Sequence, residues 1–295
     1  MHQNNTCLVC GSNQFEPFLV CKDYTVSKED FQIVSCKSCG FKFTNPRPAD
    51  SVIGVYYKSE DYVSHSNTRK GLINRVYHWV RNYTLGKKLA LVSRHVSRGT
   101  ILDYGCGTGM FLSVCHKAGW TCFGMEPDTD ARALAKEQDL PEIYSNKAEL
   151  VASMGNKQAD AITLWHVLEH VTDMDETLSF FKKTLSEKGI LIIAVPNYKS
   201  FDAAYYKEYW AAYDVPRHLY HFSQDTMQKL LDKSGFKLVE TLPMKFDSFY
   251  VSMLSEKYKT GSSSLFKAFS TGLKSNVRAK SAAEYSSVIY VFKHA

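Results

Sequence analysis

Short apolar runs alternate with amphipathic segments from residue 99 to the end of the chain. Runs of about 4–8 apolar residues predict buried strands, and apolar residues spaced three or four apart predict helices. Strands and helices that alternate in this way indicate a parallel sheet with helices on both faces. The expected strands are 100–105, 121–128, 142–146, 159–166, 190–197, 236–243 and 285–294, and the expected helices are 109–119, 130–140, 148–154, 172–189 and 223–235.

Capping residues set the expected helix boundaries. Thr172 is the expected N-cap of the helix that ends just before Gly189, and Ser223 is the expected N-cap of the next helix. An insertion at 245–284 separates the last two strands, and its stretch 259–266 is expected to be flexible. Upstream of the first strand, helices are expected as far as about residue 96 from the helical spacing of Leu72, Val76, Trp79, Val80, Tyr83 and Leu89.

Composition suits a folded protein with a core. The chain has 295 residues, of which 44% are hydrophobic and 22% charged. The formal charge of +6 is uneven, because residues 1–50 hold five basic and five acidic residues and residues 245–295 hold eight and three. The basic end is either a patch for an anionic partner or a solvated helix face. The sequence shows no leader pattern and no apolar run of about 20 residues, so we expect a cytoplasmic protein without a membrane span.

Four of the eight cysteines lie in two C-x2-C pairs near the N-terminus. Each pair is followed by a glycine, which lets the chain fold back beneath two thiolates aimed at one point. Two such turns make a tetrahedral sulfur site that suits zinc, and disulfides or unpaired thiols are the alternatives. Cys21 lies between the pairs without a partner and is expected to be a small core residue. The expected zinc ligands are Cys7, Cys10, Cys36 and Cys39.

A glycine-rich turn follows the first strand of the alternating region. Asp103 ends that strand, and glycines follow at 105, 107 and 109, a spacing that differs from the G-x-G-x-x-G of dinucleotide folds. A carboxylate repels a pyrophosphate but attracts an ammonium or sulfonium group. The second strand ends at Glu126, where a carboxylate can accept both hydroxyls of a ribose. A cationic amino acid joined to a ribose describes S-adenosylmethionine.

The stretches ILDYGCGTG (101–109), GMEPD (124–128) and DAITLWHVLEHV (160–171) resemble class I S-adenosylmethionine-dependent methyltransferases. The resemblance covers roughly residues 55–295 and implies a Rossmann-like α/β fold, with a seven-stranded sheet whose last strand is antiparallel. It implies the methionine end of the cofactor near Asp103, its ribose on Glu126 and its adenine near 145–148. The cofactor-binding residues expected from the resemblance are Asp103, Gly105, Cys106, Gly107, Glu126, Pro127, Asn146, Leu164 and His166.

We expect three parts along the chain: a zinc-ribbon-like domain at 1–50, a helical lid or linker at 51–98, and the methyltransferase domain at 99–295. Within the methyltransferase domain, 197–222 is the expected substrate loop and 245–284 is the insertion.

The motif WHVLEH holds His166, Glu169 and His170. H-x-x-E-H also occurs in inverted zinc peptidases, but there it must lie on a long helix so that both histidines share one face. Here it follows a strand directly. The resemblance instead places His166 beside the cofactor, with Glu169 and His170 on the substrate side or at the cap of the next helix. For His170 a purely structural role is an equal alternative.

A second polar cluster occurs in WAAYDVPRHLYHFS, residues 210–223, which contains Asp214, Arg217, His218 and His221. A histidine titrates near neutral pH and suits a general base, and an arginine suits a phosphate or carboxylate. Structural hydrogen bonding is the alternative for both histidines. We favour function for His218 and structure for His221.

A narrower resemblance joins the four-cysteine segment, the aromatic stretch around Tyr57 and Tyr62, and the H-x-x-x-F-S loop. Together they look like the sugar C-methyltransferases that act on nucleotide-linked keto-deoxysugars, within the bacterial methyltransferase type 11/23 group. That resemblance implies His218 as base and Tyr62 as a substrate-side tyrosine, with His170 and His166 as further catalytic candidates. Two departures are Arg217, where those enzymes have a glutamate, and the missing large C-terminal domain.

The leading hypothesis is methyl transfer to a small-molecule acceptor or one linked to a nucleotide or lipid, with a sugar among the candidates. A zinc-ribbon module on a non-catalytic methyltransferase-like domain is the alternative. The neutral charge of residues 1–50 argues against nucleic acid as its partner. A dehydrogenase is disfavoured because the dinucleotide fingerprint is missing. The acceptor atom and the oligomeric state stay open.

Overall fold

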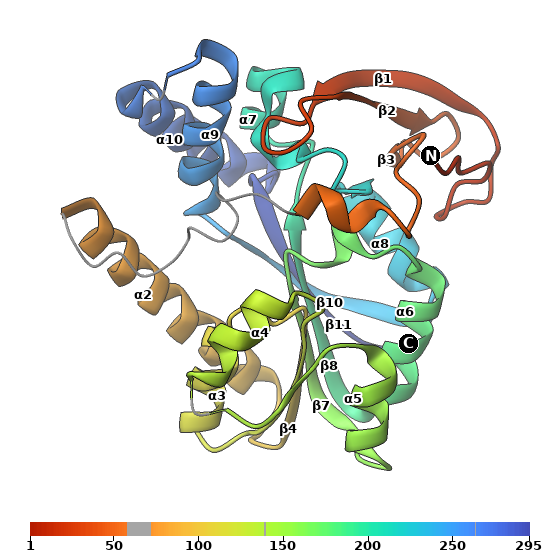
Figure 1. Cartoon of the computed structure of the whole chain (residues 1–295), viewed down its shortest axis with the longest axis vertical. Helices are drawn as coiled ribbons and strands as arrows, with labels where there is room; N and C mark the ends of the chain where they lie inside the picture. The colour runs from red at the N-terminus through yellow and green to blue at the C-terminus, as the bar shows by residue number, and fades with distance from the viewer. Residues whose placement is uncertain (58–71, 139, 263) are drawn as a thin grey trace.

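A seven-stranded sheet forms the centre of the computed structural model, which describes residues 1–57, 72–138, 140–262 and 264–295 (Figure 1). The strand order is β10-β11-β8-β7-β4-β5-β6. The strands are β4 (Thr100–Tyr104), β5 (Thr121–Met125), β6 (Ile143–Tyr144), β7 (Ala159–Trp165), β8 (Leu185–Pro196), β10 (Phe236–Pro243) and β11 (Ser287–His294).

The directions of the strands confirm the predicted sheet. Strands β4 to β8 pair in parallel, and β11 lies between β8 and β10, antiparallel to both. The last strand of the chain is therefore the reversed one. The carboxyl ends of β4, β5 and β7 meet at one edge of the sheet, which is where parallel α/β sheets bind ligands.

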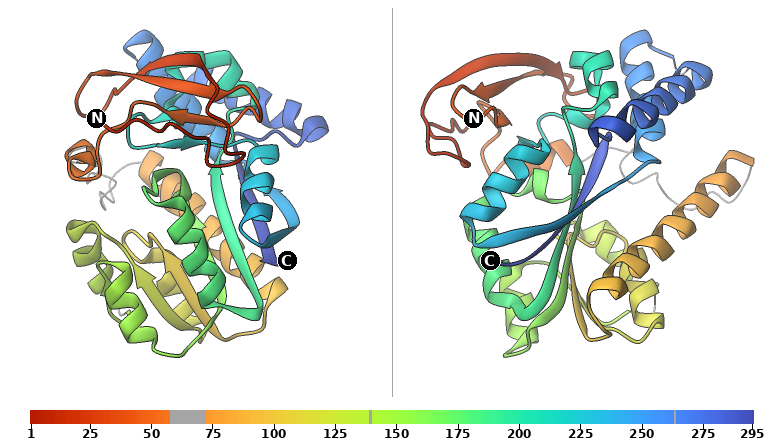
Figure 2. Two further views of the ribbon diagram at one scale, coloured as in Figure 1. Left: turned by 90° about the vertical axis from the view of Figure 1, so that its right-hand side faces the viewer. Right: turned by 180° about the vertical axis from the view of Figure 1, so that it is seen from behind.

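Helices cover both faces of this sheet (Figures 1 and 2). One face buries apolar residues from α2, α3 and α4, and the other buries residues from α5, α6 and α8. These helices are α2 (Leu72–His95), α3 (Met110–Lys117), α4 (Thr129–Lys136), α5 (Lys147–Met154), α6 (Met174–Thr184) and α8 (Gln224–Lys233).

Two predicted caps of one helix are wrong, and a third is confirmed. Helix α6 is capped by Asp173, whose side chain accepts from the N–H of Glu176, and not by Thr172. It ends at Thr184, because β8 begins at Leu185 and already pairs there with β7. Ser223 caps α8 with a capping box, as predicted.

A second sheet carries the N-terminal segment. It has four antiparallel strands in the order β1-β2-β3-β9, and its last strand comes from the loop after β8. Cys21 is buried in a core with Phe31 and Ile33, as expected for a small core residue. The strands are β1 (Phe15–Lys22), β2 (Asp30–Cys36), β3 (Lys42–Thr44) and β9 (Tyr220–His221).

The insertion between β10 and β11 forms two packed helices, α9 and α10, which the strand and helix pattern did not predict. The stretch 259–266, which was expected to be flexible, includes the last residues of α9 and the first residues of α10. No helix within the described ranges is long and apolar enough to cross a membrane. The remaining helical elements are η1 (Ile53–Tyr57), η2 (Leu168–His170), α7 (Phe201–Tyr206), η3 (Lys207–Tyr209), η4 (Ala211–Tyr213), α9 (Asp247–Thr260) and α10 (Leu265–Ala282).

Candidate active site

Asp103 lies one residue before the carboxyl end of β4, at the edge of the sheet where the ends of β5 and β7 also lie. Its side chain is buried, and the hydroxyl of Thr163 on β7 donates to Oδ1 at 2.6 Å. Burial raises the pKa of Asp103 to about 7, although the bond from Thr163 acts in the opposite direction. The carboxyl group is therefore poised to ionise when a cation comes near it.

Glu126 follows β5 and ties that strand to the glycine turn. Its Oε2 accepts the N–H of Gly107 at 2.9 Å, and its Oε1 accepts the N–H of Asp128 at 2.9 Å. Burial raises the pKa of Glu126, while these two backbone bonds lower it. The carboxylate is thus held at the rim of the turn.

The three glycines of the turn serve two different purposes. Gly105, Gly107 and Gly109 all have positive φ, which favours glycine. A Cβ at Gly105 would lie 2.6 Å from the side chain of Val167, and one at Gly109 would lie 2.6 Å from the side chain of Leu140. A Cβ at Gly107 would meet no heavy atom within 4 Å. Two glycines therefore permit close packing, and the middle one borders open space that a ligand could fill.

We call Asp103, the turn 105–109 and Glu126 the glycine-loop site. The side chains of Cys106, within this turn, and of Leu164 on β7 are buried. Pro127 and Asn146 are exposed after β5 and β6, which are neighbouring strands, and the side chain of Asn146 accepts from the N–H of Glu149 to cap α5.

His166 and Glu169 follow β7 at the same sheet edge. His166 has a φ of 59°, and this left-handed turn brings its Nε2 to 3.0 Å from Oδ2 of Asp247 on α9. Its Nδ1 lies 3.4 Å from Oε1 of Glu169. Burial lowers the pKa of His166, but hydrogen bonds to the two carboxylates outweigh it and raise the pKa to about 10. His166 is accordingly a cation at neutral pH.

His170 and His218 face the same glutamate. One ligand atom from each of Glu169, His170 and His218 lies within 4.8 Å of the others, and the two rings meet edge to face with centroids 4.5 Å apart. The carboxylate of Glu169 is buried, and in the described part of the chain its Oε1 pairs with His166 and lies 4.0 Å from Nε2 of His218. We call His166, Glu169, His170 and His218 the histidine cluster.

A backbone carbonyl fixes the tautomer of neutral His218. Its Nδ1 lies 2.9 Å from the carbonyl oxygen of Ala212, and a carbonyl can only accept, so Nδ1 carries the proton and Nε2 keeps a lone pair. Nδ1 of His170 lies 3.1 Å from the carbonyl oxygen of Arg217. Nε2 of His218 lies 4.0 Å from Glu169 and 3.9 Å from Asp214. Tyr57 completes the group, with its hydroxyl 3.0 Å from Nδ1 of His170.

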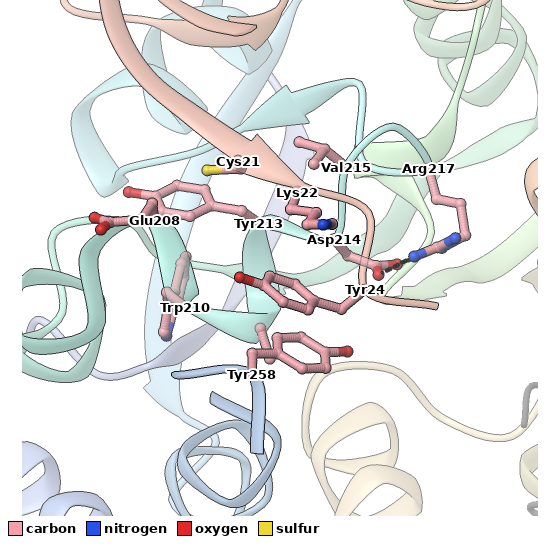
Figure 3. A pocket seen from close by; sticks show the side chains of 11 residues that line it. Cys21, Lys22, Tyr24, Glu208, Trp210, Tyr213, Asp214, Val215, Arg217 and Tyr258 are labelled. Carbon is pink, nitrogen blue, oxygen red and sulfur yellow. Dashed lines mark hydrogen bonds and ion pairs between the residues drawn. The ribbon is translucent and has the colours of Figure 1, made fainter. Parts of the chain in front are cut away.

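Arg217 is buried and holds protein groups, although its residue type also suits an anionic ligand. It donates to both oxygens of Asp214 at 2.9 and 2.6 Å, to Asp23 at 3.3 Å and to the carbonyl oxygen of Tyr56 at 2.9 Å. Figure 3 shows Arg217 beside Asp214 at the rim of a small pocket that Tyr24 and Tyr258 also line. The cavity volume is about 10 Å³, room for one water molecule. Through these bonds Arg217 links the N-terminal segment to the loop that carries His218.

His221 lies on β9 and contacts β3. Nε2 of His221 lies 3.3 Å from the hydroxyl of Thr44, which itself donates to the carbonyl oxygen of His218 at 2.8 Å. Burial lowers the pKa of His221 well below its usual value. These features support the structural role favoured for His221. Tyr62 lies outside the described residues.

The four cysteines converge as the spacing predicts. Their sulfur atoms all lie within 4.8 Å of one another, and Cys7–Cys39 and Cys10–Cys36 are 3.6 Å apart. Zinc–sulfur bonds of about 2.3 Å in a tetrahedron place sulfur atoms about 3.8 Å apart. The separations fit such a site and exceed by far the ~2.05 Å of a disulfide bond.

Sequence reasoning missed two residues that contact the candidate site residues. Asp247 pairs with His166 from 81 residues away, and Asp23 pairs with Arg217 from 194 residues away. Neither lies in a motif, and nothing local marks either one. Only the fold brings them to the site.

Comparison with known proteins places this chain in a family. The model of the "Methyltransferase domain" family matches residues 77–241, more than half of the chain. An uncharacterized methyltransferase of Bacillus cytotoxicus is 25% identical over 155 residues, covering 49% of this chain and 73% of that protein. One from Bacillus mycoides is 26% identical over 155 residues with the same coverage.

Solved structures show the same fold. Magnesium protoporphyrin IX methyltransferase from Synechocystis PCC 6803 with bound S-adenosylhomocysteine has a TM-score of 0.54 and 15% identity, covering 84% of this chain and 100% of that one. Its structure with S-adenosylmethionine has a TM-score of 0.51 and 14% identity, covering 85% and 100%. The chain belongs to the methyltransferase domain family, and it is a class I S-adenosylmethionine-dependent methyltransferase.

Proposed function

We propose that the enzyme methylates a small acceptor, with a sugar carried on a nucleotide or lipid among the candidates, and that His218 removes the acceptor's proton. The observation that carries the base assignment is the bond from Nδ1 of His218 to the carbonyl oxygen of Ala212. It leaves the Nε2 lone pair directed toward Glu169 and Asp214. These carboxylates would stabilise the imidazolium that forms when the proton arrives.

The other histidines are poorer bases for physical reasons. His166 is already protonated between Asp247 and Glu169, with its pKa raised to about 10. Burial, with the nearby His218, lowers the pKa of His170 to about 4, which weakens it as a base. We assign His166 and His170 to positioning the acceptor and the cofactor.

The glycine-loop site is the proposed cofactor site. Gly107 borders open space, Glu126 lies at the rim of the turn, and Asp103 lies one residue before the carboxyl end of β4. We assign Glu126 to the ribose hydroxyls and Asp103 to the cationic methionine end. The proposed site has as its further members Gly105, Cys106, Pro127, Asn146, Leu164 and His166.

The chemistry needs alignment and one proton acceptor. S-adenosylmethionine, when bound, supplies an electrophilic methyl group. The histidine cluster would hold the acceptor so that its nucleophilic atom faces that group. Nε2 of His218 takes the proton that the acceptor loses, and the bond from its Nδ1 to Ala212 stays in place throughout. Glu169 and Asp214, which lie 4.0 and 3.9 Å from Nε2 of His218, would stabilise the new positive charge.

The four cysteines would hold a structural zinc ion. The donor set is all thiolate and leaves no open position for a substrate, which is typical of structural sites. We therefore assign the metal to the folding of the N-terminal segment and not to methyl transfer.

The test is a methyl-transfer screen against nucleotide sugars, lipid-linked sugars, quinone precursors and acyl carriers. On the acceptor found, His218→Ala should lower turnover by about 10²–10⁴-fold, the usual contribution of a positioned base. Its affinity for S-adenosylmethionine should stay within about twofold, because no cofactor contact is assigned to this residue.

The matched control is His116→Ala, which removes an exposed histidine of α3 and should leave turnover unchanged. Normal turnover by His218→Ala would overturn the base assignment. A wild-type protein that binds the cofactor but methylates no member of any acceptor class would overturn the acceptor assignment.

A further inference from the structure

Helix α10 exposes its large apolar side chains and buries its small ones. The side chains it packs against the protein are Ala268, Thr271, Gly272, Ser275 and Ala279. Its exposed apolar side chains, with their exposed fractions, are Leu265 (59%), Phe266 (84%), Phe269 (59%), Leu273 (47%) and Val277 (55%). We call the latter set the α10 stripe. Water disfavours such a contiguous apolar row, so a row of this kind marks an interaction surface.

The buried face of α10 is fixed in place, so the stripe cannot turn inward. The hydroxyl of Ser275 donates to Oδ1 of Asp202 at 2.6 Å, and that of Ser248 donates to the carbonyl oxygen of Gly272 at 3.1 Å. A Cβ at Gly272 would lie 3.0 Å from the backbone nitrogen of Phe249 on α9. The two helices therefore touch backbone to backbone, and the opposite face of α10 is held toward solvent.

Positive charge borders the stripe. Residues 257–283 contain six basic residues and no acidic residue. On α10, Lys267, Lys274 and Arg278 fall in one row beside the stripe, and Lys280 lies at its C-terminal end. All four are exposed. An apolar row beside a basic row is the pattern of helices that lie in the interface of a lipid bilayer.

We propose that α10 docks on an anionic lipid surface, with the α10 stripe in the interface and the basic row on the lipid headgroups. Charge decides between a membrane and a second copy of the chain. A two-fold self-contact through the stripe would set one basic row beside another without any acid on this helix to pair with it. Anionic headgroups complement that row.

The docking helix is connected to the reaction site. Helix α9 carries α10 on one side, and its first residue, Asp247, contacts His166 of the histidine cluster. Figure 2 shows the two helices at the end of the sheet that also carries the N-terminal segment. If the proposed function holds, this connection favours an amphiphilic acceptor that is methylated at the bilayer surface.

Co-sedimentation with vesicles tests the docking. The full chain should sediment with vesicles of phosphatidylcholine and phosphatidylglycerol, and it should stay in solution with phosphatidylcholine alone. About 0.5 M salt should weaken binding, because the headgroup attraction is screened. Phe266→Ser combined with Phe269→Ser should weaken partitioning by about tenfold or more, because two exposed rings leave the interface.

The matched control combines Val20→Ser with Val151→Ser, two exposed apolar residues on other elements, and should sediment like the wild type. A second variant, Lys267→Glu with Lys274→Glu, should lose binding to anionic vesicles while its helix content stays unchanged. Wild-type protein that stays in solution with anionic vesicles would overturn the proposal. So would equal sedimentation of the phenylalanine variant, or a lipid-free dimer that this variant converts to monomers.

The assay needs neither cofactor nor acceptor, so its outcome is independent of the methyl-transfer assignment. Calorimetry of S-adenosylhomocysteine binding to the phenylalanine variant should match the wild type. A variant that no longer binds vesicles but keeps turnover on a soluble acceptor would reject only the amphiphilic acceptor.

Discussion

The glycine-loop site and the histidine cluster lie at the same edge of one sheet, but their residues come from different parts of the chain. The first uses backbone and side chains that follow two neighbouring strands, such as the bonds from the N–H groups of Gly107 and Asp128 to Glu126. The second gathers side chains from the segment after β7 and from the loop after β8, and Asp247 of α9 contacts it. The backbone of the His218 loop is in turn bonded to β3. One site is local in the sequence and the other depends on the whole fold.

Because of this difference, we expect relatives to share the first site more readily than the second. A turn held by its own backbone can bind the same cofactor in many proteins of one family. The histidine cluster and its loop are held by Asp247 in the insertion and by Asp23 and Thr44 in the N-terminal segment. All three residues lie outside the region that the family model matches, residues 77–241. We infer that the second site sets the acceptor.

Loss of zinc should separate the two sites most strongly. Cys36→Ser should remove one zinc ion per chain and melt the N-terminal sheet, because such small segments owe their fold to the metal. The histidine cluster would lose its support from β3, while binding of S-adenosylhomocysteine would persist. Elemental analysis, limited proteolysis and calorimetry measure the three effects.

Cys21→Ser is the matched control, since it changes a buried cysteine of the same segment outside the cluster, and it should keep its zinc. Near-zero zinc in wild-type protein purified without a chelator would contradict this account.

Replacing the buried Arg217 should have the next largest effect, on the free energy of unfolding. Arg217→Met leaves the carboxylate of Asp214 without its arginine partner and removes the contacts of Arg217 with Asp23, and breaking such a buried pair costs about 3–5 kcal/mol of unfolding free energy. Urea unfolding measures this cost. Arg94→Met breaks an exposed pair with Glu240 and should cost about 1 kcal/mol or less. Equal losses in the two variants would show that Arg217 does not hold the N-terminal segment to the loop.

The pH dependence of cofactor binding sharpens the account of Asp103. Burial raises the pKa of this carboxyl group to about 7 in the free protein, and a bound ammonium group would favour its charged form. Binding then releases a proton, so affinity should fall as the pH drops below 7, by up to about tenfold per pH unit, and level off above 7. Asp103→Asn should remove this slope in calorimetric titrations between pH 5.5 and 8. A slope that persists in the variant would assign it to another group.

The features that are local in the sequence could be predicted, and those that depend on distant segments could not. The strand and helix alternation predicted all seven strands of the sheet, and the glycine spacing predicted the turn, because both are local patterns of burial and backbone conformation. Two cysteine pairs predicted their own convergence. The caps of α6 were wrong because β8 begins before the expected helix ends, and pairing with β7 overrides local propensity there.

Long-range pairings lay beyond sequence reasoning. Asp247 belongs to an insertion whose two helices follow no motif, and its role depends on where α9 packs. The saturation of Arg217 by Asp23 and Asp214 likewise depends on how two distant segments meet. A sequence pattern names residue types that suit a chemistry, and only packing decides which partners they find.

One calorimetric comparison tests the central claim, that the glycine-loop site binds the cofactor and His218 acts only on the acceptor. S-adenosylhomocysteine is titrated into the wild type, Glu126→Ala and His218→Ala under the same conditions. We expect Glu126→Ala to lose about 1.5–3 kcal/mol, about 10- to 150-fold in affinity, because it removes hydrogen bonds from a charged group to the ribose. His218→Ala should bind like the wild type. Equal weakening in the two variants, or a wild type that does not bind, would contradict the account.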